Sequence, residues 1–235
     1  MLWLHETHRV RGAHEEEFEA AFREGWMPTL AKDDDARLLY FMHLAHGSGR
    51  AYVVTTITAV RDGAAWERLA RRVQTGDLRE WARDVDQLRH GVQGKILFPL
   101  PWSDRIATLD LADVPTDGAA DHELTLFMED TAWPHEGMLD DYLEAAETQY
   151  APSLKAGNRG LIELQGALQT AWGTGRRAEV VLWQKILDHD RLAHLLTHEV
   201  PPEFRKPGTW MIDALRVRDD WESRLLRTVR WSPLY

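Results

Sequence analysis

The chain has 235 residues, of which 44% are hydrophobic and 28% charged, and it contains no cysteine. This is ordinary globular composition, and without cysteine neither disulfides nor thiolate metal sites can form. The net charge of −10 argues against nucleic acid or an anionic membrane as a partner. No apolar run approaches the roughly 18 residues that span a bilayer, and His5, Glu6 and His8 interrupt the N-terminus too early for a signal peptide. We therefore expect a cytoplasmic protein.

The first part of the chain predicts strands and helices in alternation. Phe18, Phe22 and Trp26 recur at helical spacing and predict a helix over 15–27. The glycine-bearing segment 47–50 lies between two β-rich runs and predicts a hairpin. The expected elements are strands over 2–7, 38–46, 51–60 and 95–100, and helices over 15–27, 64–73 and 78–90.

The same order of elements returns after a segment rich in Pro, Gly, Ala and Asp. This segment, 105–121, predicts a linker. It would join one module over 1–104 to a second over 122–235. The expected elements of the second module are strands over 124–129, 161–172, 179–187 and 224–229, and helices over 137–150, 191–198 and 209–217.

Three sequence matches in one register indicate an internal duplication. WMPTL at 26 returns as YAPSL at 150, and GSGRAYVV at 47 returns as GTGRRAEVV at 173. KILFPLPWS at 95 returns as RLLRTVRWS at 224. The offset in residue number between matching segments grows only slightly along the chain, and small loop insertions account for this growth.

Each copy has the order β-α-β-β-α-β, which is the ferredoxin-like arrangement with both helices on one face of an antiparallel sheet. The predicted strands are apolar on both sides, so the second face of each sheet must also be covered. Two fused copies can cover each other, sheet against sheet. The sequence therefore predicts an α+β fold of tandem ferredoxin-like modules that enclose a barrel, with the helices outside.

The segments that carry this pattern resemble those of NIPSNAP-family proteins. They are Gly47 with Val53 and Val54, 97–103, Gly173 with 180–183, and 225–234. That family is similar to the dimeric α/β-barrel superfamily, which holds cofactor-free monooxygenases, polyketide cyclases, muconolactone-type isomerases and haem proteins. The resemblance implies the fold and leaves the reaction open. This sequence departs from the pattern at 55–57, where polar residues replace an expected aromatic residue.

Alternation along the strands predicts which side chains enter the barrel. Leu2 and Leu4 suit a helix-facing row, so Trp3 and His5 should face the interior. On the second and third strands of each copy, a slip of one residue would reverse the assignment. The predicted interior set is Trp3, His5, His43, Thr56, Glu129, Gln169, Trp183 and Lys185.

Three of these residues are candidates for catalysis, namely His5, His43 and Glu129. Histidine titrates near neutral pH and suits a general base, and burial can raise a carboxyl pKa for the same use. The substrate-binding candidates are Trp3, Thr56, Gln169, Trp183 and Lys185. In the alternative interpretation the histidines are hydrogen-bonded core residues, and Glu129 only pairs with Lys185.

Eleven histidines also raise the question of a metal or haem. His5 and His8, like His43 and His46, have the spacing of a ligand pair, but residues three apart on a strand point to opposite faces. We therefore predict no metal and no other cofactor, with haem or a metal ion as a lesser alternative. Phosphate-loop, nucleophile-elbow and dinucleotide motifs are absent from the sequence.

The leading hypothesis is an enzyme that acts on a hydrophobic, aromatic or polycyclic small molecule inside the barrel. Eleven tryptophans favour an aromatic-lined cavity. Cofactor-independent oxygenation, cyclisation and isomerisation all fit. A non-catalytic ligand-binding or interaction module is the second hypothesis and a haem protein the third. We expect no nucleic-acid or membrane partner, and a homodimer is compatible with the sequence.

Overall fold

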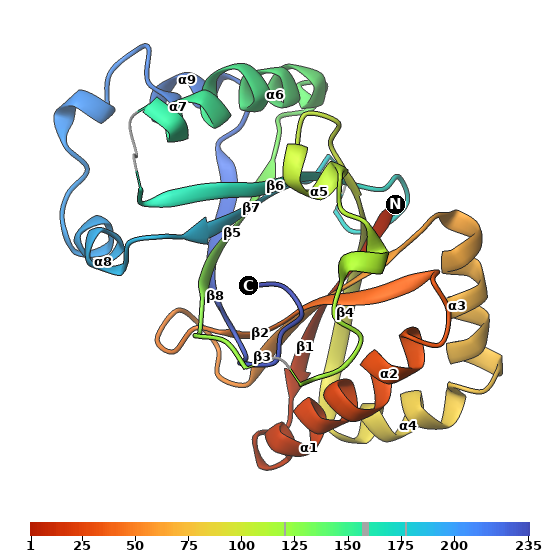
Figure 1. Ribbon diagram of the computed structural model, residues 1–235. Coiled ribbons are helices and arrows are strands. Elements are labelled where there is room, and N and C mark those ends of the chain that lie inside the picture. The colour runs from red at the N-terminus through yellow and green to blue at the C-terminus, as the bar shows by residue number, and fades with distance from the viewer. Residues whose placement is uncertain (120, 157–159, 177) are drawn as a thin grey trace.

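The computed structural model describes residues 1–119, 121–156, 160–176 and 178–235. In this part of the chain, eight strands form a closed antiparallel barrel in the order β1-β3-β2-β8-β5-β7-β6-β4 (Figure 1). The strands are β1 (Leu2–Val10), β2 (Ala36–Leu44), β3 (Val53–Val60), β4 (Arg89–Pro99), β5 (Leu126–Trp133), β6 (Ile162–Thr170), β7 (Val180–Ile186) and β8 (Asp220–Thr228).

Two ferredoxin-like sheets make up this barrel. β4-β1-β3-β2 belong to the first copy and β8-β5-β7-β6 to the second, so both copies have the same strand order. The copies join at two short seams, where β2 pairs with β8 and β4 pairs with β6. The predicted α+β barrel of tandem modules is confirmed.

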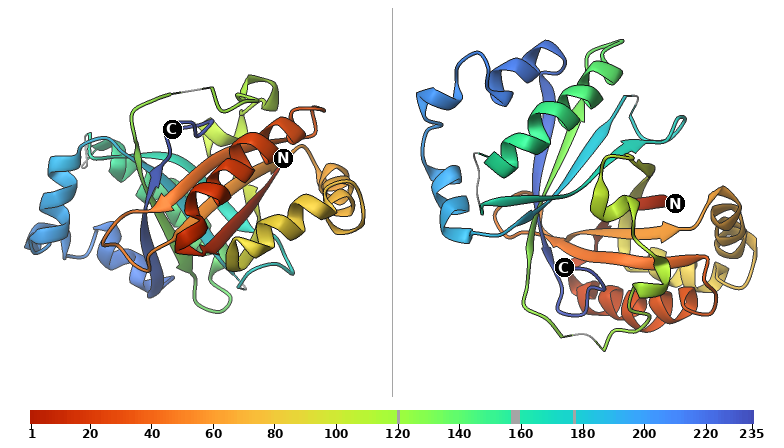
Figure 2. Two further views of the ribbon diagram at one scale, coloured as in Figure 1. Left: turned by 90° about the horizontal axis from the view of Figure 1, so that it is seen from below. Right: turned by 45° about the horizontal axis from the view of Figure 1, so that its top comes forward.

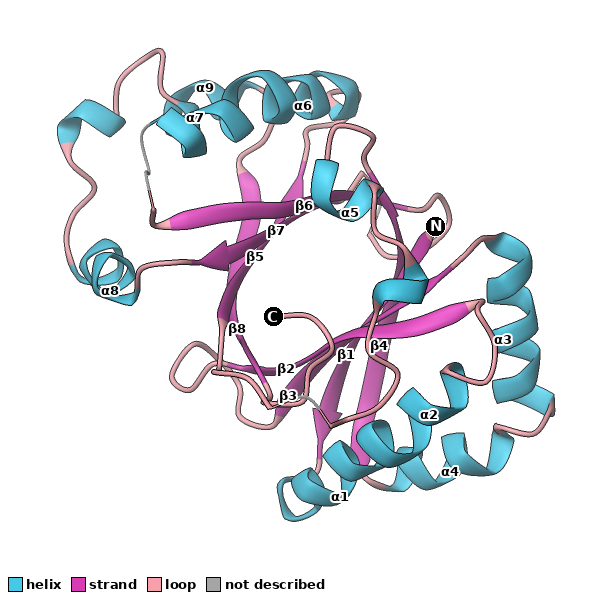
Figure 3. Cartoon of the chain, in the orientation of Figure 1, coloured by secondary structure: helices cyan, strands magenta, loops and turns pink. Residues whose placement is uncertain are grey.

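Apart from the short α5 at one end of the barrel, the α-helices lie outside the ring of strands, against its outer face (Figure 3). Both copies contain a π-helical turn at the same place in their first helix, Ala21–Trp26 and Ala146–Tyr150. No described helix combines the length and apolar character needed to cross a membrane. The α-helices are α1 (Glu15–Ala20), α2 (Met27–Leu30), α3 (Gly63–Thr75), α4 (Arg79–Gln87), α5 (Asp104–Ala107), α6 (Leu139–Ala145), α7 (Ala151–Ala156), α8 (His189–Thr197) and α9 (Trp210–Asp213).

The tail of each copy packs against the other copy. After β4, the Ser103 hydroxyl accepts a hydrogen bond from the backbone N–H of Ala167 in β6, at 2.7 Å. After β8, the Ser232 hydroxyl accepts one from the N–H of Phe41 in β2, at 3.2 Å. Trp231 is correspondingly buried in the helix-side core of the first copy. This reciprocal exchange repeats the aromatic-serine motif with the same role in both copies.

The barrel interior holds an apolar core. Trp3, Phe127 and Trp183 are fully buried there, together with side chains from most of the other strands. The linker adds Ile106 and Leu111 to the same core, and Figure 2 shows the linker and the C-terminal tail at one end of the barrel. The linker is therefore part of the fold, because it closes that end.

One predicted helix is longer than the observed one. The pattern predicted a helix over 78–90, but α4 ends at Gln87 and β4 already begins at Arg89. Arg89 is the partner of Val10 at the end of the β1–β4 ladder. Pairing with β1 has overridden the local helical preference of these residues.

Candidate functional site

Four of the predicted interior residues are buried where the sequence placed them. Trp3, His5, Glu129 and Trp183 are buried inside the barrel. His5 Nε2 and Glu129 Oε2 are 2.7 Å apart, so an ion pair links β1 of one copy to β5 of the other. Arg224 donates to the second carboxylate oxygen at 3.4 Å.

Glu129 is therefore a paired carboxylate. Burial alone would raise its pKa, but the charge and hydrogen bond of His5, with Arg224 and Lys95, hold the pKa well below the ordinary value. A carboxylate in this state is a poor base at neutral pH. The expected partner Lys185 faces inward but donates to the backbone carbonyl of Tyr235 at 3.1 Å. The interior pair thus matches the core interpretation, with His5 in place of Lys185.

The interior placement of His43, Gln169 and Thr56 is wrong. His43 Nδ1 lies 3.1 Å from Glu15 Oε1 in α1, on the helix-facing side. Gln169 follows Leu168, which faces the barrel core, and so points the other way. Thr56 likewise faces the helices, where its hydroxyl lies 2.9 Å from His8 Nε2.

Irregularities in the strands explain two of these errors. A β-bulge interrupts β2 between Leu38 and Tyr40, and another interrupts β6 between Leu164 and Gly166. Each bulge shifts the register by one residue and reverses the faces beyond it. On β3 the face assignment itself was off by one, since Ile57 and not Thr56 enters the barrel core.

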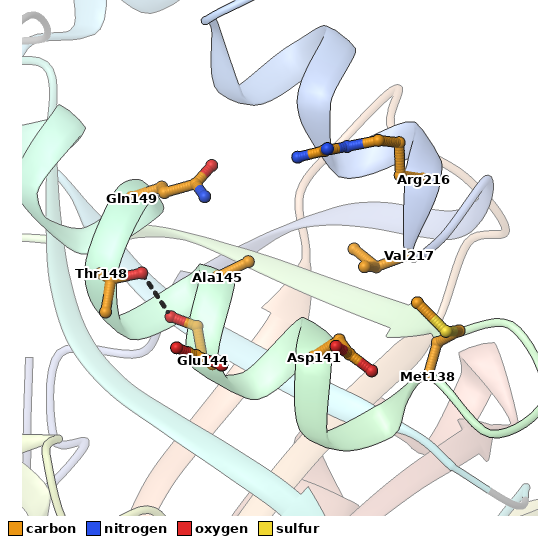
Figure 4. Close-up of a pocket in the computed structure, with 8 residues that line it drawn as sticks. All are labelled: Met138, Asp141, Glu144, Ala145, Thr148, Gln149, Arg216 and Val217. Atoms are coloured by element: carbon orange, nitrogen blue, oxygen red, sulfur yellow. Dashed lines mark hydrogen bonds between the residues drawn. The ribbon is translucent and has the colours of Figure 1, made fainter.

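Two surface pockets lie in the helix layers, one in each copy. The pocket of the second copy, with a volume of about 340 Å³, runs between α6 and the segment that holds Arg216 and Val217 (Figure 4). Asp141, Glu144 and Gln149 line it from α6 and the π-helical turn, and they are exposed. This groove has no aromatic wall, and none of its carboxyl groups is buried.

The pocket of the first copy differs in both respects. It has a volume of about 300 Å³ and lies between the outer face of β1 and β4 and the helices of the first copy. Trp26, Trp66 and Trp81 line it, and Trp66 is 39% exposed at the surface. The Trp26 and Trp81 rings stack 4.6 Å apart at an angle of 13°. We call this pocket the tryptophan groove.

The π-helical turn of the first copy shapes one wall of the tryptophan groove. The indole N–H of Trp81 donates to the backbone carbonyl of Ala21 in this turn, at 3.2 Å. A Cβ atom at Gly25 would lie 2.8 Å from Trp81 Nε1. The absence of a side chain at Gly25 therefore lets Trp81 approach the turn and stack on Trp26.

Glu6 provides the acidic group of the groove. It lies on β1 opposite Gly94 of β4, and both residues line the groove. Its carboxyl forms no hydrogen bond or ion pair with the residues that the structure describes. Burial raises the pKa of Glu6, while the charges of Arg89 and His5 act against that rise. Glu6 is thus a half-buried, unpaired carboxyl whose surroundings favour its protonated form.

Arg89, at the start of β4, provides a cation in the same groove. Its Nε and Nη2 donate to Asp86 Oδ1 at 3.0 and 2.6 Å. Its Nη1 lies 2.8 Å from His8 Nδ1. Because a guanidinium can only donate, His8 Nδ1 accepts, and its Nε2–H donates to Thr56. Burial lowers the pKa of His8 well below its ordinary value, and the Arg89 charge adds to this.

The second copy fills the equivalent position with hydrogen bonds. Asp130 occupies the place of Glu6, and Gln184 Nε2 donates to its Oδ2 at 2.8 Å. Tyr150, the counterpart of Trp26, in turn donates to Gln184. Ser223 lies opposite Asp130, as Gly94 lies opposite Glu6. The second copy therefore hydrogen-bonds one oxygen of its carboxyl and buries the other without a partner among the described residues. Asp130 lines neither pocket, whereas Glu6 faces the tryptophan groove.

Sequence reasoning missed Glu6, Arg89 and the aromatic wall. The signal for Glu6 was present, because Glu6 and His8 share the strand face of Leu2 and Leu4, which a helix layer should cover. A carboxyl on such a face is either paired or functional. Arg89 carried no comparable signal, since the pattern assigned it to a helix.

Comparison with solved structures supports the fold. A protein from Lactobacillus acidophilus assigned as a monooxygenase matches over 99% of this chain and 96% of its own, with 10% identity and a TM-score of 0.60. The fold is that of the dimeric α+β barrels. An anthrone oxidase-like protein matches this barrel over 97% of the chain and 91% of its own, with 9% identity and a TM-score of 0.57. Chlorite dismutase from Candidatus Nitrospira defluvii matches over 97% and 90%, with 8% identity and a TM-score of 0.51.

Single-module proteins match only part of the chain. An uncharacterized NIPSNAP domain protein from Burkholderia xenovorans matches over 43% of the chain and 95% of its own, with 17% identity and a TM-score of 0.35. That similarity is too low to carry an argument, so the fold rests on the full-length matches. Comparisons with known protein families and with curated proteins find no match.

The described histidines are spread over the fold. In this part of the chain no group of three His, Asp or Glu side chains is arranged to hold a metal ion. Neither pocket is lined by a histidine. Both ring nitrogens of the buried His8 are in contact with Thr56 and Arg89, and Nε2 of His5 is in contact with Glu129. His8 therefore offers no free nitrogen to a haem iron.

Proposed function

We propose that this barrel is an enzyme that binds a flat hydrophobic small molecule in the tryptophan groove and removes a proton from it with Glu6. The observation that carries the proposal is the unpaired, half-buried carboxyl of Glu6 at the base of a groove walled by tryptophan. An unpaired buried carboxyl lowers stability, so a fold that keeps one in a groove suggests a use for it. The proposed site thus lies between the sheet and the helices, not inside the barrel.

The groove supplies three elements of such a reaction. The tryptophan rings stack on a flat ring system and exclude water from it. The raised pKa of Glu6 brings the carboxyl closer to the range in which a general base works well. Arg89 lines the same groove, and its positive charge stabilises the negative charge that the ligand gains when its proton leaves. Such a proton abstraction can begin a cofactor-independent oxygenation, a cyclisation or an isomerisation.

Anthrone is a suitable probe, because it is flat, tricyclic and carries an acidic C–H across the ring from a carbonyl. Glu6 would take that proton and leave the electron pair on the ligand. Reaction of the anion with dioxygen then gives anthraquinone and one water. The appearance of anthraquinone, followed by its absorbance against an enzyme-free blank, measures the reaction. The Glu6→Gln variant should lose roughly 10²–10⁴-fold in rate, the usual contribution of a general base.

Binding is tested separately from catalysis. Anthrone should quench the tryptophan fluorescence in a saturable way, and Trp66→Ala should weaken this binding. Trp172→Ala is the matched control, because Trp172 is 100% exposed and does not line the groove. Saturable binding with no turnover would favour the ligand-binding module. If anthrone turnover is unchanged in Glu6→Gln, Glu6 is not the base.

A further inference from the structure

An acid and a cation line the tryptophan groove without pairing with each other. Glu6 and Arg89 are both lining residues, and the charge of Arg89 is close enough to oppose the rise in the pKa of Glu6. The two nevertheless form no ion pair: the Arg89 guanidinium bridges to Asp86 instead. Opposite charges this close normally pair with each other, because an unpaired charge is costly to bury. Something must hold Arg89 away.

Two contacts hold Arg89 from opposite sides. Asp86 in α4 accepts from Nε and Nη2, but its carboxylate is 60% exposed. His8 on β1 accepts from Nη1 and is fully buried, with Phe18 and Phe22 packed against its ring at 5.1 and 5.5 Å. The buried imidazole, packed between these rings, therefore holds the guanidinium more firmly than the exposed carboxylate does.

The imidazole is also fixed in its hydrogen-bonding state. Its Nε2–H donates to Thr56 at 2.9 Å, which leaves Nδ1 as an acceptor for Arg89. Protonation would turn that acceptor into a donor and place two cations in contact. Burial and the Arg89 charge both disfavour this, so His8 stays neutral.

Arg89 keeps free hydrogen-bonding capacity toward the groove. A guanidinium has five N–H donors, and three of them go to Asp86 and His8. The other two, on Nη1 and Nη2, find no acceptor among the residues that the structure describes. A ligand oxygen near Glu6 would be a suitable acceptor.

We propose that His8 is a positioning residue that, with Asp86, holds Arg89 off Glu6, so that the two groups act on different atoms of one ligand. Glu6 takes the proton, and Arg89 donates to an oxygen on which the negative charge then resides. This inference rests on the proposed function for its use, but the positioning itself is testable without a substrate. The ligand class it implies is a flat molecule in which an acidic C–H or O–H is conjugated to a carbonyl or hydroxyl oxygen.

The charged groups around the two residues are few, which makes the test clear. Glu6 is influenced by Arg89, His5 and Asp86, and Lys95 at the groove is paired with Glu179 of the second copy. His8 is influenced by Arg89 and His5. Replacement of a neutral His8 therefore changes no charge near Glu6, and a change in the Glu6 pKa would report movement of Arg89.

The experiment follows the titration of Glu6 by NMR in protein labelled with ¹³C at the glutamate carboxyl carbons. Glu6→Gln identifies the signal. We expect the wild-type midpoint above 4.5, the ordinary value. In His8→Leu, Arg89 loses its buried acceptor and closes on Glu6, and the midpoint should fall. His8→Gln, whose amide oxygen can still accept from Arg89, should keep the midpoint near that of the wild type.

A second pair of variants covers the case in which His8→Leu does not fold. Asp86→Asn loosens the other contact of Arg89, but it also removes a negative charge that itself raises the pKa of Glu6. The same change in an Arg89→Gln background measures that direct charge effect alone, so Asp86→Asn should lower the midpoint more when Arg89 is present. If His8→Leu does not lower the midpoint, or does not fold, and Asp86→Asn lowers it no more in the presence of Arg89 than in its absence, the positioning role is wrong. A lowered midpoint without anthrone turnover would instead uphold the positioning and contradict the proposed function.

Discussion

At the scale of single residues, Glu6 shows how a functional group can lower the stability of its own fold. Its pKa is raised in the folded protein, chiefly by burial. The unfolded chain therefore releases the proton at a lower pH than the folded protein does. Above pH 4.5, the pKa of the unfolded chain, ionisation of Glu6 therefore lowers the free energy of unfolding, and at lower pH this effect is absent.

Glu6→Gln should accordingly stabilise the protein at neutral pH while it slows proton transfer. We expect a gain on the order of 0.5–2 kcal/mol at pH 7, and little or no gain at pH 4, where the wild-type carboxyl is protonated. Thermal unfolding at the two pH values measures this. Glu16→Gln on the exposed side of α1 is the control and should change neither value. An equal gain at both pH values would contradict the proposed cause.

At the scale of elements, the π-helical turn of the first copy depends on one glycine. Gly25→Ala places a methyl group 2.8 Å from Trp81 Nε1, so the stacked Trp26–Trp81 wall must shift. We expect a loss of about 1–3 kcal/mol, as for other overpacked sites. Gly63→Ala at the first position of α3 meets nothing within 4 Å and should instead stabilise the protein by about 0.4–1 kcal/mol, because it restricts the unfolded chain. Urea unfolding of the two variants should therefore give changes of opposite sign.

The elements also show which parts of the fold the sequence could predict. Strand and helix order followed from hydrophobic periodicity, and the duplication placed each element twice. Which side chains of the first strands face the interior was predictable, because no bulge interrupts β1 between Leu2 and His5 or β5 between Phe127 and Glu129. Beyond the bulges in β2 and β6 the inward-facing side chains were not predictable, because the hydrophobic pattern does not reveal the extra residue of a bulge.

The candidate site was harder to predict than the fold. The sequence suggested a cavity within the barrel, but it gave no measure of how closely Trp3, Phe127 and Trp183 would pack there. The tryptophan groove depends on contacts between α4, the π-helical turn and β1, which are distant in sequence. Its acidic residue could be found from its strand face alone, whereas its cation could not.

At the scale of the whole molecule, the buried pair of His5 and Glu129 ties the two copies across the barrel. The pKa of Glu129 is lowered in the folded protein. The stabilisation from the ionised carboxylate is therefore complete above the unfolded value of 4.5 and is lost as the pH falls below it.

Removal of this carboxylate should be costly, because it leaves His5 and Arg224 without their buried partner. We expect Glu129→Gln to lose about 3–5 kcal/mol at pH 7. The difference from the wild type should shrink below pH 4, as measured by urea unfolding across this range. Glu222→Gln, an exposed change on the neighbouring strand β8, controls for net charge. A loss that persists undiminished in acid would mean that packing, and not the ion pair, is responsible.

The exchange of the two tails imposes an order on the folding of this protein during its synthesis. Trp231 and Ser232, near the end of the chain, complete the core and the hydrogen bonding of the first copy. During synthesis the first copy must therefore wait, with Phe41 and its neighbours uncovered, until the segment after β8 has been added. Its completion is thus timed by translation of the second copy, and removal of residues 231–235 would leave the earlier-made half of the molecule unfinished.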